Sequence, residues 1–138
     1  MRPSIKDTWR HESVTKYAIV KGDFNGDGVV DEAKLLMRQD GTGFGLFAFV
    51  SQQGNLFKIY QLDEIKNNKF IKITGIKNVT NGSYKTACGK GYWDCRKDEH
   101  PEIIIKNDSI DYFKIEGANS FFYWDGNAND FKRIWISD

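Results

Sequence analysis

The sequence predicts a mainly β protein: a single antiparallel β domain over residues 1–138, built as a meander, sandwich or curled sheet of about seven to nine strands with at most one or two short helices. Thirteen glycines outnumber two prolines, and they cluster between β-branched and aromatic runs. Several of these runs alternate between apolar and polar positions. A length of 138 residues suits one core, since about 150 residues per domain is usual.

Two elements are expected in the N-terminal segment. Ser4 could cap a short helix in which Ile5 and Trp9 share a face. Residues 17–24 then alternate as a strand would. One face of that strand holds Tyr17 and Ile19, and the other holds Ala18, Val20 and Phe24.

The next expected strand covers residues 31–38, which by composition also suit a helix. A glycine-rich turn at 41–45 follows at once, and this favours the strand. Three further strands follow, the first two of them paired as a hairpin around Gln53–Asn55. They cover residues 46–51, 56–62 and 70–76.

Two hairpins are expected in the last third of the chain. In each, apolar runs flank a turn rich in Asn and Asp, residue types that tolerate the positive φ of tight turns. They pair 102–106 with 110–116 around Asn107–Asp108, and 121–124 with 131–136 around Asp125–Asp130.

The charges are balanced, with 20 Lys and Arg against 19 Asp and Glu and a net charge of +1. Domains that bind nucleic acid usually carry a large basic excess, because neutralising phosphates supplies most of their affinity. Disordered tails need one sign of charge to dominate. The balance therefore argues against both classes, and nucleic acid is not an expected partner.

No segment of the sequence predicts membrane insertion or a secretory signal. The longest apolar runs, such as Ile103–Ile105, are far shorter than the roughly 20 residues that a spanning helix needs. Residues 1–7 contain no apolar stretch and so do not form a signal peptide. We expect either a cytoplasmic protein or a mature domain whose signal has been removed.

The acidic loop, Gly22–Glu32, is the most informative segment and spells D-x-N-x-D-G-x-x-D from Asp23 onward. Oxygen ligands at alternate positions let a tightly wound backbone aim several side chains at one point. Gly28 permits the sharp turn that brings in the carbonyl of Val29, and Asp31 adds a further oxygen. Such a hard, anionic set of ligands suits Ca²⁺ better than softer metals.

The acidic loop departs from the EF-hand, in which the twelfth position is a bidentate Glu and not Lys34. Position by position it resembles the calcium loops of FG-GAP repeats, the blades of integrin α-chain propellers and related bacterial proteins. Calcium is bound at the matching positions of that family, so the resemblance implies Ca²⁺ as cofactor. The implied metal ligands are Asp23, Asn25, Asp27, Val29 through its backbone, and Asp31.

The resemblance covers only about 20 residues around one loop. A propeller needs at least four blades, so neither the propeller nor its adhesive function is expected here. A bound calcium would be structural, since no general base stands out near the loop. An Asp/Asn/Gly hairpin that binds nothing remains the alternative, and we interpret the weaker acidic stretch Asp125–Asp130 as a turn.

Cys88 and Cys95 are the two cysteines of the chain, and six residues separate them. We expect a disulfide that closes a small loop, with two glycines that let the chain fold back. Two alternatives stay open: a zinc site that recruits His100 and Asp98, and two reduced thiols. A disulfide would place the protein outside the cytoplasm, periplasmic or secreted. A weak calcium site indicates the same, since extracellular calcium is abundant.

The cysteine loop also presents candidate partner-binding residues. A crosslinked loop with aromatic side chains suits binding, because its ordering cost is already met. Trp93 could equally pack into the core. Residues 66–97 hold eight basic side chains and one acidic, so the loop could face an acidic partner; alternatively, these lysines lie beside the acidic C-terminal strands. The candidate residues are Lys90, Tyr92, Trp93, Arg96 and Lys97, with Lys85 nearby.

We identify no catalytic motif and no residues for an organic cofactor. His11 and His100 are expected to be surface residues. The sequence therefore predicts a non-enzymatic, calcium-binding extracytoplasmic domain that binds a macromolecule, most simply a protein, as inhibitors or toxin-immunity proteins do. The alternatives are a glycan-binding module that uses Trp93, Trp124 or Trp135, and a hydrolase with a structural calcium.

Overall fold

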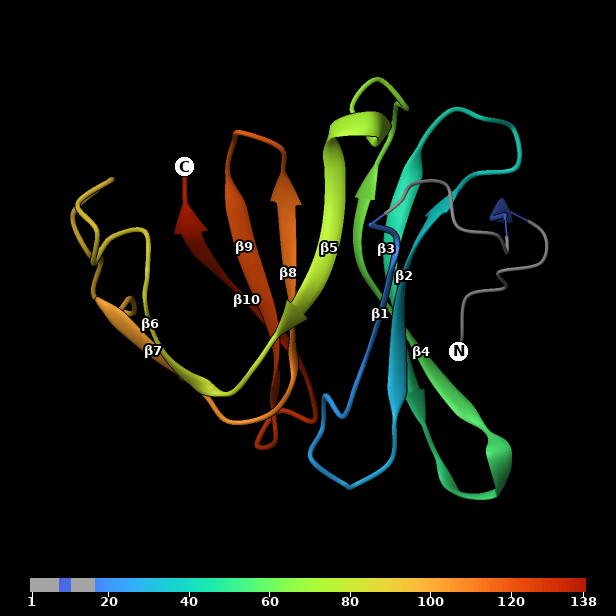
Figure 1. The fold of residues 1–138 in the computed structure, drawn as a ribbon, viewed down its shortest axis with the longest axis horizontal. Helices are drawn as coiled ribbons and strands as arrows, with labels where there is room; N and C mark the ends of the chain where they lie inside the picture. Colours follow the sequence, from blue (N-terminus) through green and yellow to red (C-terminus); the bar gives the residue numbers. More distant parts are fainter. Residues whose placement is uncertain (1–7, 11–16) are drawn as a thin grey trace.

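The computed structural model describes residues 8–10 and 17–138. Within these ranges ten strands form three antiparallel sheets, and the helical content is two single 3-10 turns (Figure 1). This confirms the mainly β prediction, with one strand more than the expected range. The strands are β1 (Ile19–Gly22), β2 (Asp31–Met37), β3 (Phe44–Ser51), β4 (Phe57–Ile65), β5 (Thr74–Val79), β6 (Gly82–Lys85), β7 (Glu102–Ile105), β8 (Ser109–Lys114), β9 (Asn119–Asp125) and β10 (Asp130–Ser137), and the 3-10 turns are η1 (Gln53–Asn55) and η2 (Ile71–Ile73).

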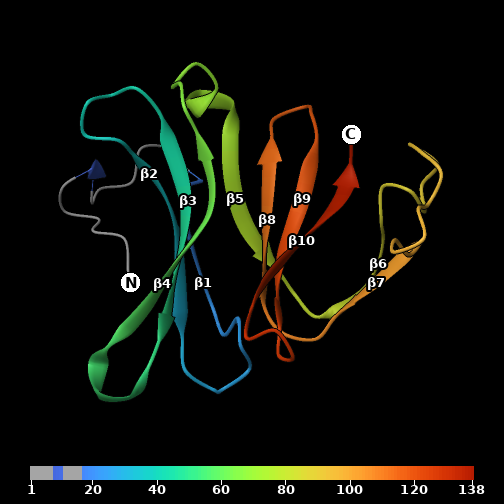
Figure 2. The same cartoon turned by 180° about the vertical axis from the view of Figure 1, so that it is seen from behind.

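Two four-stranded sheets, ordered β1-β2-β3-β4 and β10-β9-β8-β5, enclose a shared core (Figures 1 and 2). On one side β1 runs beside β5, where the Ile76 amide donates to the Tyr17 carbonyl at 2.8 Å. On the other side the ring of Tyr60 in β4 contacts Trp124 and Phe131, so side chains close the space between β4 and β10. The buried residues of this core are Ala18, Val20, Phe24, Ala33, Leu35, Phe44, Leu46, Ile71, Ile76, Ile110, Tyr112 and Phe122.

The outer faces of both sheets are covered as well. Trp9 packs on Leu36 and Phe47 of the first sheet, with the Trp9 and Phe47 ring centroids 4.7 Å apart. The β6–β7 hairpin covers the second sheet, where Val79, Ile105, Phe121 and Ile136 form a separate apolar cluster. Ser4 and Ile5 of the expected N-terminal helix, and His11, lie outside the described residues.

Most expected strands are confirmed by the register. In and beside β1, Ala18, Val20 and Phe24 are buried while Tyr17 and Ile19 are exposed, as the alternation predicts. Residues 31–38 form a strand, and β3 pairs with β4 around η1. The expected strand at 70–76 begins later, because residues 71–73 form a 3-10 turn in which Thr74 Oγ1 donates to the Phe70 carbonyl at 2.7 Å.

The expected hairpin around Asn107–Asp108 is wrong. β7 pairs with β6, and β8 lies between β5 and β9, so these residues carry the chain from the small sheet to the second large sheet. Their side chains explain the difference, because both bond to the backbone of the acidic loop. The hairpin formed by β9 and β10 is as expected.

No helix among the described residues has the length and apolarity needed to cross a membrane.

Candidate functional site

The acidic loop joins β1 to β2 at the lower end of the molecule in Figure 1. Two of its glycines have left-handed backbones, Gly26 with φ of 75° and Gly28 with φ of 87°. A Cβ at Gly26 would also lie 2.8 Å from Asn107 Oδ1. Gly26 is therefore required both by the turn and by the close approach of Asn107 in the connection between β7 and β8.

The polar side chains of the loop turn inward and bond to its own backbone. Asp23 accepts from the amides of Asp27 at 3.1 Å and Gly28 at 2.7 Å. Asp27 Oδ1 accepts from the Val29 amide at 2.9 Å, and Asn25 Oδ1 accepts from the Asp27 amide at 3.4 Å. Each oxygen has a second lone pair, so these bonds order the loop and leave acceptor capacity in Asp23, Asn25 and Asp27.

Asp31, the first residue of β2, is fully buried. Its two oxygens accept from the amides of Phe24 and Ser51, each at 2.9 Å. Burial raises the pKa of this carboxyl, and the charges of Asp27 and Asp23 raise it further, while the two backbone hydrogen bonds lower it. No cationic side chain of residues 8–10 or 17–138 forms an ion pair with Asp31. The end of the first sheet therefore contains a buried carboxyl group that no cationic side chain of the described residues pairs with.

The connection between β7 and β8 contributes two residues that the sequence analysis assigned to a hairpin turn. Asp108 Oδ2 accepts from the Asp23 amide at 3.0 Å, and Asn107 Nδ2 donates to the Phe24 carbonyl at 3.2 Å. Asn78 of β5 adds a bond from Nδ2 to the Lys21 carbonyl at 2.9 Å. The adjacent Asn107 and Asp108 are visible in the sequence, but their local pattern does not show whether they form a hairpin turn or bond to a distant loop. We call their two hydrogen bonds to the acidic loop the clamp.

The chemistry of these oxygens fits a hard cation such as Ca²⁺. Asp23, Asn25 and Asp27 retain free lone pairs, and the uncompensated charge at Asp31 would be offset by a cation. Within the described ranges, however, no group of three or more His, Cys, Asp or Glu side chains is arranged to hold a metal ion. Binding would therefore require the loop to close around the ion, and the ligand set stays a prediction.

A cavity of about 390 Å³ lies beside the acidic loop. The turn after β9 forms part of its wall. In that turn Asp125 accepts from the Asn127 amide at 2.9 Å and pairs with Lys132 at 2.7 Å. These contacts are typical of a turn and agree with the interpretation of Asp125–Asp130 as a turn. The cavity is lined by Asn25, Ile104, Lys106, Asn107, Ser109, Tyr123, Trp124, Asp125, Gly126 and Asn127.

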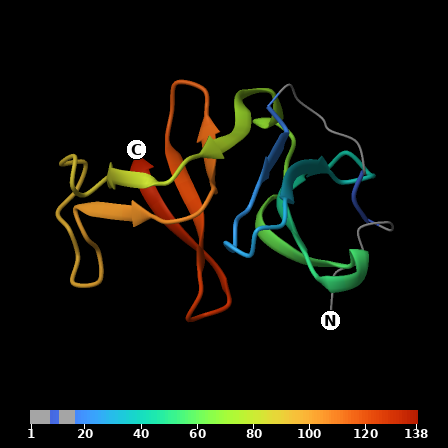
Figure 3. The ribbon, with the colours of Figure 1, turned by 60° about the horizontal axis from the view of Figure 1, so that its bottom comes forward.

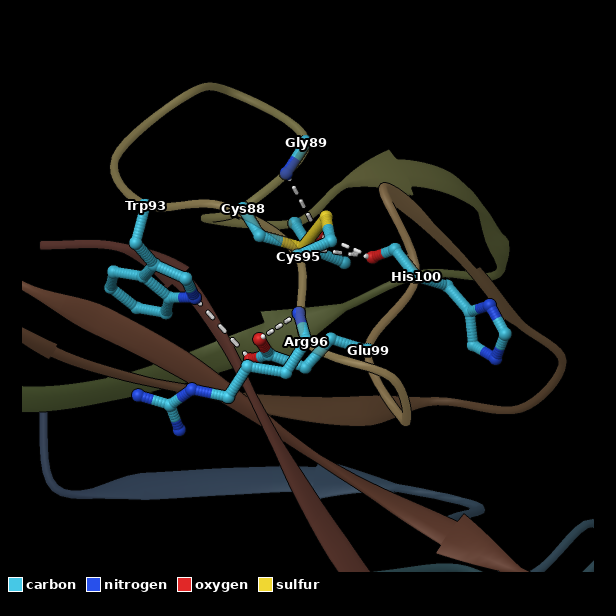
Figure 4. Close-up of a disulfide and its surroundings, with 8 residues drawn as sticks. Cys88, Gly89, Trp93, Cys95, Arg96, Glu99 and His100 are labelled. Carbon is cyan, nitrogen blue, oxygen red and sulfur yellow. Dashed lines mark hydrogen bonds between the residues drawn. A yellow bond between two sulfur atoms is a disulfide. The ribbon is translucent and has the colours of Figure 1, made fainter.

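Cys88 and Cys95 form a disulfide, with their Cα atoms 4.9 Å apart (Figure 4). This confirms the expected pairing and excludes the zinc and free-thiol alternatives for these two residues. The bond lies within a tip, residues 86–101, which connects β6 to β7 (Figures 1 and 3). The tip is joined to the second large sheet where the Ala87 amide donates to the Trp135 carbonyl of β10 at 2.9 Å. A disulfide is consistent with an oxidising compartment outside the cytoplasm.

Hydrogen bonds fix the backbone of the tip. Thr86 Oγ1 donates to the His100 carbonyl at 2.6 Å and accepts from the Gly89 amide at 3.2 Å. Glu99 accepts from Trp93 Nε1 at 3.3 Å and from the Arg96 amide at 2.9 Å (Figure 4). A Cβ on Gly89 would lie 1.9 Å from the Pro101 carbonyl oxygen, so only glycine fits there. The tip is therefore ordered before any partner arrives.

The candidate partner-binding residues lie together on this tip. Lys90, Tyr92, Arg96 and Lys97 are exposed. Trp93 is half-buried and belongs to none of the three apolar clusters, and its Nε1 is bonded to Glu99. Acidic side chains lie among the basic ones, at positions 94, 98, 99 and 102.

The basic excess of residues 66–97 is spread over the fold. Lys77 on β5 pairs with Asp111 of β8 at 3.7 Å, and Lys85 lies opposite Glu102 in the small sheet. For these two residues the simpler alternative holds, since acidic C-terminal strands lie beside them. The exposed basic residues of the tip thus remain as the candidates for an acidic partner surface.

Comparison with protein-family models, with curated proteins and with solved structures finds no match for this chain. The likeness of the acidic loop to FG-GAP loops therefore stays a likeness of one motif.

We expect Asp108→Ala to destabilise the protein by about 1–3 kcal/mol, because the Asp23 amide loses its charged acceptor in a part-buried place. Urea denaturation followed by circular dichroism measures this change in the free energy of unfolding. Asp98→Ala is the matched control: it removes an exposed carboxylate of the tip and should change the stability by less than about 0.5 kcal/mol. Equal stability of the two variants would contradict the clamp.

Proposed function

We propose that this chain is a non-enzymatic, calcium-binding extracytoplasmic β domain that binds a protein partner, as inhibitors and toxin-immunity proteins do. The observation that carries the proposal is the disulfide-closed tip, which is ordered by its own bonds yet keeps its contact side chains free. A pre-ordered loop loses little conformational entropy on binding, so more of its contact energy appears as affinity.

The composition of the tip supports a protein as partner. Exposed Tyr92 offers the kind of aromatic contact that dominates protein interfaces. Arg96 and Lys97 add charges that speed association with an acidic surface. The nearby acidic side chains would restrict which surfaces fit, because like charges across an interface are costly. The disulfide supports a periplasmic or secreted location for this encounter.

Calcium would have a structural role at the opposite, loop-bearing part of the fold. The positive charge of the ion would offset the carboxylates of Asp23, Asp27 and Asp31. The loop contacts Asn107 and Asp108 as well as β3, so ordering it would also tighten the junction between the two large sheets.

Calcium should raise the melting temperature of protein refolded in chelator. At a calcium concentration one hundred times Kd, the stability gain is about 2.7 kcal/mol, which corresponds to several degrees. Asp27→Ala should abolish the shift in melting temperature. Asp40→Ala is the matched control: it removes a carboxylate from the loop between β2 and β3, and the shift should remain. Differential scanning calorimetry with calcium and with chelator is the measurement. Identical wild-type curves would disprove the calcium assignment.

Capture from the periplasmic or secreted fraction should yield a stoichiometric protein partner. The double variant Tyr92→Ala, Lys97→Glu should weaken its binding at least about tenfold, or about 1.4 kcal/mol, because both changes fall on the exposed tip. Isothermal titration of the purified pair measures the affinity. Lys58→Glu, the same charge change on β4, is the matched control and should leave the affinity unchanged.

Equal affinities of the double variant and the wild type would contradict the role of the tip. The glycan alternative has its own candidate place in the cavity beside the acidic loop, where Tyr123 and Trp124 meet several amides. Binding on a glycan array that is lost in Trp124→Ala but kept in the tip variant would favour that alternative.

A further inference from the structure

A second cavity, of about 140 Å³, lies between the two edge strands β4 and β10, and none of its lining residues belongs to the acidic loop. These strands share no hydrogen-bond register, and their aromatic contacts involve Tyr60, Trp124 and Phe131. The cavity lies near the C-terminal ends of β8 and β10, where Lys114 and Trp135 line it. Its lining residues are Asp63, Ile65, Thr74, Tyr112, Phe113, Lys114, Ala118, Arg133 and Trp135.

A β-bulge turns Asp63 toward this cavity. Pairing of β3 with β4 shifts register between Leu46 and Phe47, where Phe47 pairs with Gln61 and Leu46 pairs with Asp63. The extra residue, Leu62, packs against the shared core, and Asp63 lies opposite the core residue Leu46. Regular alternation would have directed the carboxylate away from the core. Bulges commonly re-aim a side chain in this manner near functional sites.

The buried wall of the cavity carries a hydroxyl without a partner. Tyr112 is only 6% exposed, and its Oη is a buried polar atom without a hydrogen bond. Burial raises the pKa of this phenol, and the nearby Asp63 carboxylate raises it further, so the group stays protonated. Part of the effect of Asp63 is a side-chain contact with the phenol, but the two groups do not reach the geometry of a full hydrogen bond, so Tyr112 Oη is left without a satisfying partner. A buried polar atom that lacks a partner in the protein normally meets a water or a ligand.

Arg133 brings the opposite charge to the same cavity. Its Nε donates to Ser120 Oγ at 2.9 Å, and its guanidinium lies 4.2 Å from the centroid of the Trp135 ring. No ion pair to Arg133 or to Asp63 occurs among residues 8–10 and 17–138. Neither the Arg133 guanidinium nor the Asp63 carboxylate is therefore neutralised by an ion pair within these ranges.

We propose that this cavity binds a small zwitterion, a free α-amino acid with a short apolar side chain. Asp63 accepts from the ammonium group, Arg133 donates to the carboxylate, and Tyr112 Oη bonds to one of the two. Ile65, Phe113 and Ala118 supply apolar surface for the side chain. The volume equals that of about four to five waters at roughly 30 Å³ each, which admits an amino acid no larger than about valine or leucine.

Inward charges on edge strands have another known use, since they prevent the edges from pairing with other chains. That role explains neither why the two charges have opposite sign nor why a buried hydroxyl without a hydrogen-bond partner lines the same cavity. It also predicts no ligand, so the two interpretations differ in a binding experiment.

The test is a titration of the full chain with L-alanine and L-valine up to about 10 mM, well above the Kd expected for a millimolar ligand, followed by ¹H–¹⁵N NMR. We expect saturable shifts at the amides of β4, β8 and β10 around the cavity. Isobutylamine and isobutyrate, which each carry one of the two charges of valine, should bind at least about tenfold more weakly.

Asp63→Asn and Tyr112→Phe should each weaken L-valine binding at least about tenfold, and neither removes bulk from the core. Glu64→Gln is the matched control: this neighbour faces away from the cavity, bonds to Arg38 at 3.4 Å, and should bind L-valine as the wild type does. Absence of saturable shifts with both amino acids would overturn the proposal. Binding that is unchanged in Asp63→Asn, or equal for valine and isobutyrate, would also overturn it.

Discussion

The buried carboxylate of Asp31 is the contact on which the loop-bearing end of the molecule depends. One oxygen holds the amide of Phe24 and the other holds the amide of Ser51, so a single side chain ties the start of the acidic loop to the end of β3. Phe24 is itself a fully buried core residue. The carboxylate therefore fixes the loop and, through Phe24, the lower part of the shared core.

That position has an electrostatic cost. Because burial raises the pKa of Asp31, the folded chain binds this proton more tightly than the unfolded chain. Without a cation, stability therefore falls as the pH rises from the usual Asp pKa of about 4 through the raised value. A calcium ion would favour the ionised form and reverse that trend. The same ion would strengthen the clamp from Asp108 and Asn107, because all these contacts converge on residues 23–31.

Local pattern was sufficient to predict the features that depend on neighbouring residues. Alternation correctly placed Ala18 and Val20 inside, and the spacing of Cys88 and Cys95 correctly predicted a closed loop. Local pattern gave the wrong prediction where a contact with a distant part of the chain determines the structure. Asn107–Asp108 has the composition of a turn, yet its side chains bind a loop more than eighty residues away. The bulge at Leu62 is set by pairing with β3, so no reading of β4 alone could direct Asp63 inward.

The three candidate sites are formed in different ways. A disulfide fixes the tip, and hydrogen bonds from backbone amides to its own carboxylates fix the acidic loop. The third site is a cavity between the edge strands β4 and β10, which contact each other only through side chains. Of the three, the acidic loop has the strongest need for a cation, since the carboxylates of Asp23, Asp27 and Asp31 are buried or hydrogen-bonded but are not in ion pairs with described residues.

Whether calcium neutralises this loop is measured most directly by a ¹³C NMR titration of the Asp31 carboxyl, with chelator and with excess calcium. We expect a pKa above the usual Asp value of about 3.9 in chelator and a pKa below that value with calcium. An Asp31 pKa that is the same in both conditions would contradict it.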